Sequence, residues 1–83
     1  MKLQIIIKSI ERAYNLYAEE LHWILAHLNE PIDVLAIDMY PTNLRIMHVR
    51  IHRPAVCGGA ISLFVDKGAS NIEYELVTTK VTD

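Results

Sequence analysis

The spacing of hydrophobic residues changes at Pro31, and this change constrains the fold more than any other feature of the sequence. Before Pro31, hydrophobic residues recur at intervals of three and four. After Pro31, they alternate with polar residues. The first spacing is typical of an amphipathic helix and the second of strands that bury one face. The chain is therefore predicted to have a helical first part and a strand-rich remainder.

Residues 10–29 are predicted to form one long amphipathic helix, because neither Gly nor Pro interrupts them and Pro31 ends the pattern. At about 1.5 Å per residue, such a helix would span roughly 30 Å and could cross a small sheet. Its core-facing stripe is expected to consist of Ile10, Ala13, Tyr14, Tyr17, Leu21, Ile24, Leu25 and Leu28.

Residues 2–9 contain three consecutive isoleucines, and β-branched side chains favour strands over helices. We therefore predict a strand here, with Ser9 as the N-cap of the following helix. The alternative is a single helix over residues 2–29, because Leu3 and Ile7 continue the three-and-four spacing of the helical stripe toward the N-terminus.

After Pro31 the alternation predicts four strands separated by turns. "YPTN" suits a turn at residues 40–43, and Gly58 and Gly59 can supply the positive φ angles of a tight hairpin or form a bulge. A loop, "DKGASN", precedes the last strand. The predicted strands cover residues 33–40, 44–53, 60–65 and 72–81.

The fold class predicted from these elements is α+β, with one long helix on one face of a four- to five-stranded, mainly antiparallel sheet in the order β-α-β-β-β-β. The 83 residues are expected to form a single domain, 1–83, since 52% are hydrophobic and 22% charged. One cysteine cannot form an internal disulfide, and no apolar run reaches the roughly 20 residues of a membrane span. We expect a soluble cytoplasmic protein, which a virus could equally encode.

The segment "LRIMHVRIH" predicts a strand with two different faces. Met47, Val49 and Ile51 would point to the helix, and a basic strip would lie on the opposite face. Glu73 and Glu75 on the last strand could balance that strip, which would then be an ordinary solvated surface. Alternatively, the strip binds phosphate or an acidic partner. It comprises Arg45, His48, Arg50, His52 and Arg53.

Trp23 is predicted to lie outside the core-facing stripe of the helix, directly above Leu16 at a spacing of seven residues. Glu20 and His27 border this pair. Two large apolar residues aligned outside the core suggest a second buried surface, and tryptophan is enriched at binding hot spots. We therefore expect a protein partner, or a second copy in a homodimer, to bind at Leu16, Glu20, Trp23 and His27.

Metal, cofactor and catalytic chemistry are not favoured by the spacing of the candidate residues. His48 and His52 would lie about 13 Å apart on a strand, too far to share one zinc ion. Asp33 and Asp38 would fall on opposite strand faces. Cys57, beside two glycines, is the one candidate nucleophile, but a lone cysteine in an apolar run is usually a small buried residue.

The sequence thus predicts a non-enzymatic interaction protein of the inhibitor or adaptor type, of a kind that phages encode, which binds another macromolecule and self-associates through its helix. The alternative is an RNA- or ribosome-binding module that uses the basic strip of residues 45–53. A thiol enzyme based on Cys57 is the third hypothesis.

Overall fold

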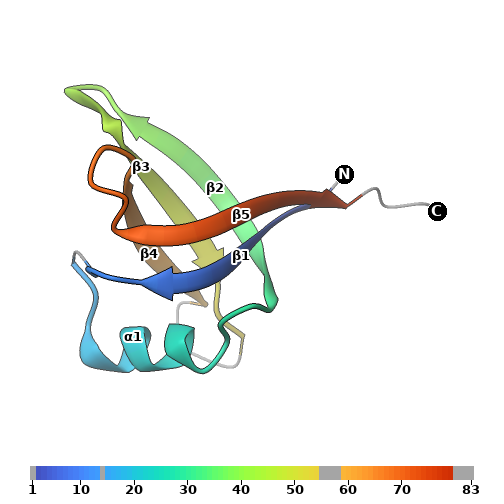
Figure 1. Ribbon diagram of the computed structural model, residues 1–83. Helices are drawn as coiled ribbons and strands as arrows, with labels where there is room; N and C mark the ends of the chain where they lie inside the picture. The colour runs from blue at the N-terminus through green and yellow to red at the C-terminus, as the bar shows by residue number, and fades with distance from the viewer. Residues whose placement is uncertain (1, 14, 55–58, 80–83) are drawn as a thin grey trace.

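A computed structural model describes residues 2–13, 15–54 and 59–79. It confirms the predicted order of one strand, one helix and four further strands (Figure 1). These elements are β1 (Lys2–Ile10), α1 (Ala18–Leu25), β2 (Pro31–Tyr40), β3 (Asn43–His52), β4 (Ala60–Asp66) and β5 (Ile72–Thr79).

The strands form one five-stranded antiparallel sheet in the spatial order β4-β3-β2-β1-β5. The sheet is strongly bent, so that β1 and β5 cross in front of β2, β3 and β4, and α1 lies below the end of β1 (Figure 1). The sheet thus has two parts, one formed by β1 and β5 and the other by β3 and β4. β2 joins them, because it pairs with β1 through its first residues and with β3 along the rest of its length.

The hydrophobic core lies between the two parts of the bent sheet, with α1 beside it. Along β3 every second side chain is buried, as the sequence predicts, because Met47, Val49 and Ile51 share one face of the strand. The helix contributes one fully buried residue, Ile24. The remaining buried hydrophobic residues are Ile5, Ile7, Ile32, Ile61, Leu63, Val65 and Ile72.

The predicted helix over residues 10–29 is wrong: α1 has eight residues. β1 continues to Ile10, which pairs with Ile72 of β5, so the strand occupies the expected start of the helix. Asn15 then adopts a left-handed φ of 58°, which an α-helix cannot contain. Tyr17 and Leu25, expected in the core stripe, are 74% and 46% exposed.

Within the described residues, no helix has the length and hydrophobicity of a membrane span.

Residues 2–9 do form a strand, which excludes the alternative of one continuous helix over residues 2–29. The three-and-four spacing of hydrophobic residues in this region therefore does not report a helix. In β1, Ile5 and Ile7 are fully buried, whereas Lys8 is exposed, as expected for a strand with one buried face.

A bulge in β2 changes the facing of its side chains. Val34 lies opposite buried Ile51, but Ala36 lies opposite exposed Arg50, so Leu35 is an extra residue between them. The alternation before Leu35 is therefore out of phase with the alternation after it. As a result Asp33 and Asp38 share the outer face of the sheet, and the prediction that they point to opposite faces is wrong.

Asn71, only 2% exposed, ties three segments together through its side chain. Its Nδ2 donates to the carbonyl oxygens of Arg12 and Phe64, both at 3.1 Å, and its Oδ1 accepts the N–H of Asp66 at 2.8 Å. The side chain therefore satisfies the main chain at the outer edge of β4. It also holds the segment after β1 against the start of β5.

Gly59, just before β4, has a φ of +57°, the left-handed conformation expected for a hairpin glycine. A Cβ atom here would come no closer than 3.9 Å to the Arg53 carbonyl oxygen, so space is not limiting. The requirement for glycine is conformational. Gly58 lies outside the described residues.

We expect Gly59→Val to lower the free energy of unfolding by about 1–2 kcal/mol, because a β-branched residue is strained at positive φ. Gly59→Asn should cost clearly less, since asparagine tolerates this conformation. Urea denaturation of both variants measures the difference. Equal losses for valine and asparagine would contradict a conformational cause.

We expect Asn71→Ala to destabilise the protein by about 2–3 kcal/mol, because it removes three hydrogen bonds, one buried at the Asp66 N–H and two partly buried at the Phe64 and Arg12 carbonyl oxygens. The control is Asn43→Ala, which removes a single exposed hydrogen bond to the Arg45 N–H and should cost under about 1 kcal/mol. Thermal denaturation of both variants would disprove the role of Asn71 if the two losses were alike.

Candidate functional site

A hollow of about 220 Å³ lies where α1, the start of β2 and the end of β3 meet. We call it the Trp23 hollow. It brings together Trp23 and His27, from the predicted partner-binding set, with His52, from the predicted basic strip. Its lining consists of Trp23, His27, Glu30, Pro31, Ile32, Asp33, His52 and Pro54.

Trp23 and His27 form the aromatic wall of the hollow. Their rings are stacked, with centroids 4.1 Å apart and planes inclined by 24°. The His27 Nδ1 lies 2.6 Å from the Trp23 carbonyl oxygen. Because a carbonyl oxygen can only accept, Nδ1 carries the proton in this contact. The hydrogen bond and the stack together hold the imidazole against the indole.

The other two members of the predicted set, Leu16 and Glu20, do not line the hollow. Leu16 is half-buried and packs against the core, and so does the inner part of Trp23. The Glu20 carboxylate accepts the Tyr17 N–H at 2.9 Å and thereby caps the start of α1. Leu16 and Trp23, predicted to lie together outside the core, therefore both pack partly against the protein's own core. The accessible part of Trp23 lines the Trp23 hollow.

Two carboxylates give the hollow an acidic side. Asp33 accepts a hydrogen bond from the Gln4 Nε2 at 2.9 Å and lies 3.2 Å from the Lys2 Nζ. The Gln4 hydrogen bond lowers the pKa of Asp33 below its usual value; partial burial opposes this shift, and Lys2 and His52 reinforce it. Glu30 is exposed at the rim.

The predicted basic strip is divided by contacts within the protein. Arg45 lies 3.5 Å from Asp66, and Arg53, whose side chain is only 12% exposed, lies 3.8 Å from Glu19 of α1. Arg50 is exposed, opposite Ala36 and Ser62 on its neighbouring strands. The three arginines therefore do not form one continuous cationic surface.

The two histidines of the strip lie in different surroundings. His52 lines the Trp23 hollow. The His48 ring stacks on Phe64 with centroids 4.7 Å apart and planes inclined by 8°, and it lies opposite Asp38 of β2. His48 and His52 thus serve separate sites.

Glu73 and Glu75 do not balance the basic strip, contrary to the expectation from their alternation. They lie on β5, at the far side of β1 and β2 from β3. Glu75 instead lies 3.8 Å from Lys8 on β1. Asp33 and Asp38, which the β2 bulge places on that face, lie beside the strip, in addition to Asp66 and Glu19 at Arg45 and Arg53.

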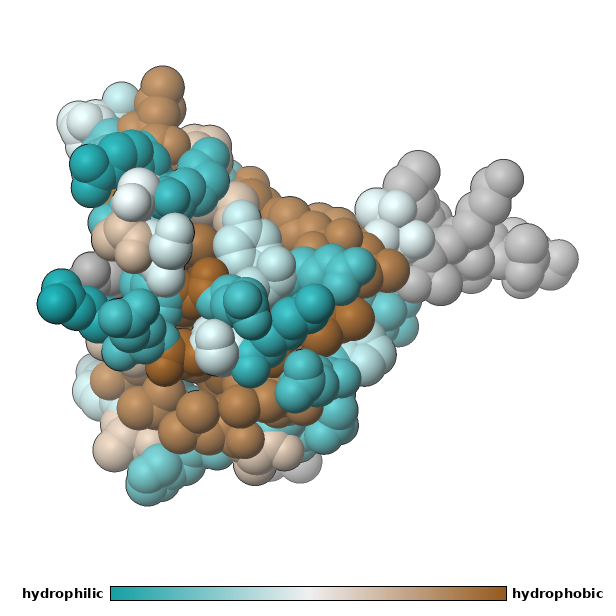
Figure 2. Space-filling view, viewed as in Figure 1, coloured by the Kyte–Doolittle hydropathy of each residue, from teal (hydrophilic) through white to brown (hydrophobic). Residues whose placement is uncertain are grey.

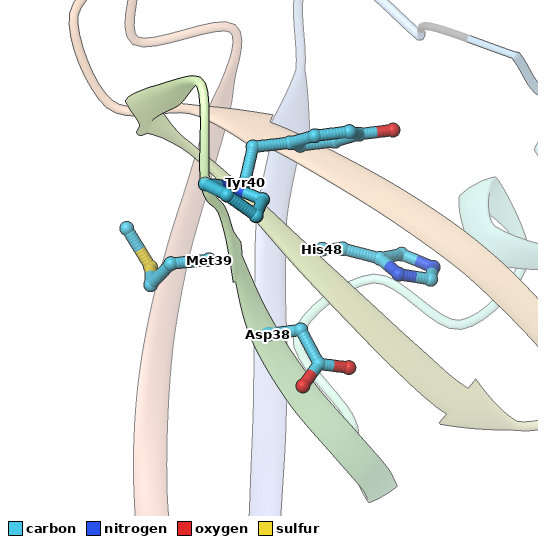
Figure 3. A pocket seen from close by; sticks show the side chains of 5 residues that line it. Asp38, Met39, Tyr40 and His48 are labelled. Carbon is cyan, nitrogen blue, oxygen red and sulfur yellow. The ribbon is translucent and has the colours of Figure 1, made fainter.

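A second hollow of about 210 Å³ lies at the turn between β2 and β3, lined by Asp38, Met39, Tyr40, Pro41 and His48 (Figure 3). Asp38 and His48 project to the same side of the sheet, and Met39 projects to the other. Tyr40 adds to the aromatic group, with its ring centroid 5.8 Å from that of Phe64. The hollow thus combines an aromatic wall with one carboxylate and one imidazole.

Cys57, the candidate nucleophile, lies outside the described residues. Within the described part of the chain, no three His, Cys, Asp or Glu side chains are arranged to hold a metal ion.

No protein-family model matches the chain, and searches of curated proteins and of solved structures return no match either.

The residues that sequence reasoning missed at the Trp23 hollow are Glu30, Pro31, Ile32, Asp33 and Pro54. Their shared signal is position: they flank the start of β2 and the end of β3. Which strand ends meet depends on the topology, and the sequence shows that only indirectly.

We expect Asp33→Asn to lower stability at pH 7 by under about 1 kcal/mol, because Asp33 lies partly exposed at the surface. The lowered pKa of Asp33 means that its carboxylate stabilises the fold above the unfolded-state pKa of about 3.9 and loses this effect as pH falls through the folded-state value. The gap between wild type and variant should therefore narrow from pH 6 to pH 2.5. Denaturation at both pH values tests this, and a widening gap would refute it.

Proposed function

We propose that this protein is a non-enzymatic interaction protein, of the inhibitor or adaptor type, that binds another protein through the Trp23 hollow. The observation that supports it most is the Trp23–His27 stack, which presents an aromatic wall in an open depression. Buried tryptophan surrounded by a polar rim is the typical composition of a binding hot spot.

The chemistry of the hollow suggests what its partner presents. Pro31, Ile32 and Pro54 supply apolar walls beside the indole, and Glu30 supplies negative charge at the rim, beside Asp33, which already lies 3.2 Å from the Lys2 Nζ. An apolar side chain of the partner would fill the space between the apolar walls. Lys or Arg residues on either side of it would pair with the negative charge at the rim. The partner segment is therefore expected to be apolar at its centre and basic at its ends.

Exposed hydrophobic surface also lies on α1 outside the lining of the hollow. Leu25 of α1 is 46% exposed, and Figure 2 shows hydrophobic residues at the surface in the region of α1. Leu25 follows Trp23 by two residues, so it projects from the other flank of the helix and forms a surface separate from the hollow.

The test is selection of peptides from a random display library on the immobilised full-length protein, followed by affinity measurement on the variants. Selected peptides should carry an apolar residue flanked by Lys or Arg. Trp23→Ala should weaken their binding by about 2 kcal/mol or more, roughly 30-fold. Because Trp23 also contacts the core, circular dichroism must confirm that this variant folds.

Glu30→Lys provides a second variant, at an exposed rim position. It should lower the affinity for basic peptides at low salt. Leu44→Ala is the matched control, since Leu44 is 68% exposed at the distant β2–β3 turn. Selected peptides that bind equally to Trp23→Ala, Glu30→Lys and Leu44→Ala would refute the proposal. Salt-sensitive binding of RNA that requires Arg50, with no peptide binding, would favour the basic strip instead.

A further inference from the structure

The outer edge of β5 is free of strand pairing in the described part of the chain. β5 pairs with β1 from Lys2 to Ile10 and ends the strand order β4-β3-β2-β1-β5. A free edge displays unpaired N–H and C=O groups, and proteins usually protect such edges with charge, proline or a covering segment. The question is which groups β5 displays and what pairs with them.

The hydrogen bonds of β1 determine which β5 residues point outward. The Ile7 carbonyl accepts the Asn29 N–H at 2.8 Å, on the side where β2 begins. The N–H and C=O groups of successive residues in a strand point to alternate sides. The main-chain groups of Ile5 therefore also point to β2, and those of Ile6 point to β5. This direction agrees with Pro31, which has no N–H to offer and lies opposite Ile6.

The same alternation carries over to β5. The main-chain groups of Gln4 and Ile6 point to β5, where their partners are Val77 and Glu75. These two β5 residues therefore direct their own N–H and C=O groups inward to β1. The residues between and beside them direct their N–H and C=O groups to the free edge. These outward-pointing residues are Tyr74, Leu76 and Thr78.

The opposite edge of the sheet, β4, is covered at its C-terminal end. The Asn71 side chain occupies the Phe64 carbonyl and the Asp66 N–H on the outer side of β4. On β5, by contrast, Leu76 is 40% exposed and lies opposite fully buried Ile5, so it belongs to the core-facing side of the sheet. β5 therefore combines an edge without strand pairing with an apolar side chain that is left in water on its core-facing side.

We propose that a second copy of this chain pairs with the β5 edge, in an antiparallel register centred on Leu76. In this register Leu76 lies opposite Leu76 of the second copy, and Tyr74 and Thr78 lie opposite each other. All three outward-pointing residues then pair, which gives on the order of six hydrogen bonds. The exposed Leu76 side chains also cover each other on the core-facing side of a continuous sheet.

Charge selects this register. A pairing centred on Tyr74 would place Glu73 directly opposite Glu75 of the second copy at two positions, which like charges disfavour. Centring on Leu76 places Glu75 opposite Val77 instead. Glu75 also lies 3.8 Å from Lys8 of its own chain, and the net charge of the whole chain is only -2. The strand is thus complementary to itself in the register that uses its outward-pointing groups.

The dimer places its contact on β5, away from α1, through which the sequence predicts self-association, and it goes beyond the function proposed for the Trp23 hollow. Amide hydrogen exchange of the full chain tests it directly. In the dimer, the N–H groups of Tyr74, Leu76 and Thr78 should be protected along with those of Glu75 and Val77. Dilution to the monomer should raise the exchange rates of Tyr74, Leu76 and Thr78 at least tenfold more than those of Glu75 and Val77.

Thr78→Pro is the disrupting variant, because it removes an outward N–H and leaves the β1–β5 ladder intact. Light scattering should show a wild-type dimer at micromolar concentration and at least a tenfold higher dissociation constant for Thr78→Pro. Thr78→Ala, which keeps the N–H, and Trp23→Ala should both remain dimeric. Circular dichroism establishes that each variant is folded.

Two results would overturn the proposal. The first is a 9.5 kDa particle at every concentration up to the millimolar range, with fast exchange at Tyr74, Leu76 and Thr78. The second is a dimer that folded Thr78→Pro leaves unchanged. If Thr78→Pro does not fold, the exchange pattern of the wild type decides, since it needs no substitution.

Discussion

The side-chain amide of Asn71 is the contact on which the arrangement of the bent sheet depends. It bonds to the edge of β4 at two points and to the segment that follows β1 at a third. β4 and β1 belong to different parts of the sheet, separated in the strand order by β3 and β2. A short polar side chain, 2% exposed, thus holds together segments that have no strand pairing in common.

The sequence predicted the elements of this fold better than it predicted their positions in space. The alternation in β3 identified Met47, Val49 and Ile51 as core residues, because a strand with one buried face leaves that pattern in any topology. The helix over residues 10–29 was wrong because the end of β1, an irregular segment and a short helix happen to place hydrophobic residues at similar intervals. Glu73 and Glu75 were matched to β3 because alternation does not reveal which strands are neighbours.

The candidate site was predictable in part for the same reason. Trp23 lies in α1 and His27 in the turn directly after it, four residues later in the chain, so their stacking depends on local structure alone. The approach of Pro31, Asp33, His52 and Pro54 to this pair follows from the meeting of two strand ends beside a helix. That meeting is set by the bend of the sheet, which no short stretch of sequence encodes by itself.

The extra residue at Leu35 has a consequence for how β2 tolerates changes in length. The bulge shifts the phase between the first and second parts of the strand, so that Val34 and Ile37 can both pack against the core although they are three residues apart. A deletion of one residue there would restore regular alternation and rotate one part of β2 by half a turn. Asp33 would then turn toward the core, or Ile37 would turn to water. β2 is therefore sensitive to the loss of a single residue, because the number of residues in it, as well as their identity, determines which side chains are inside.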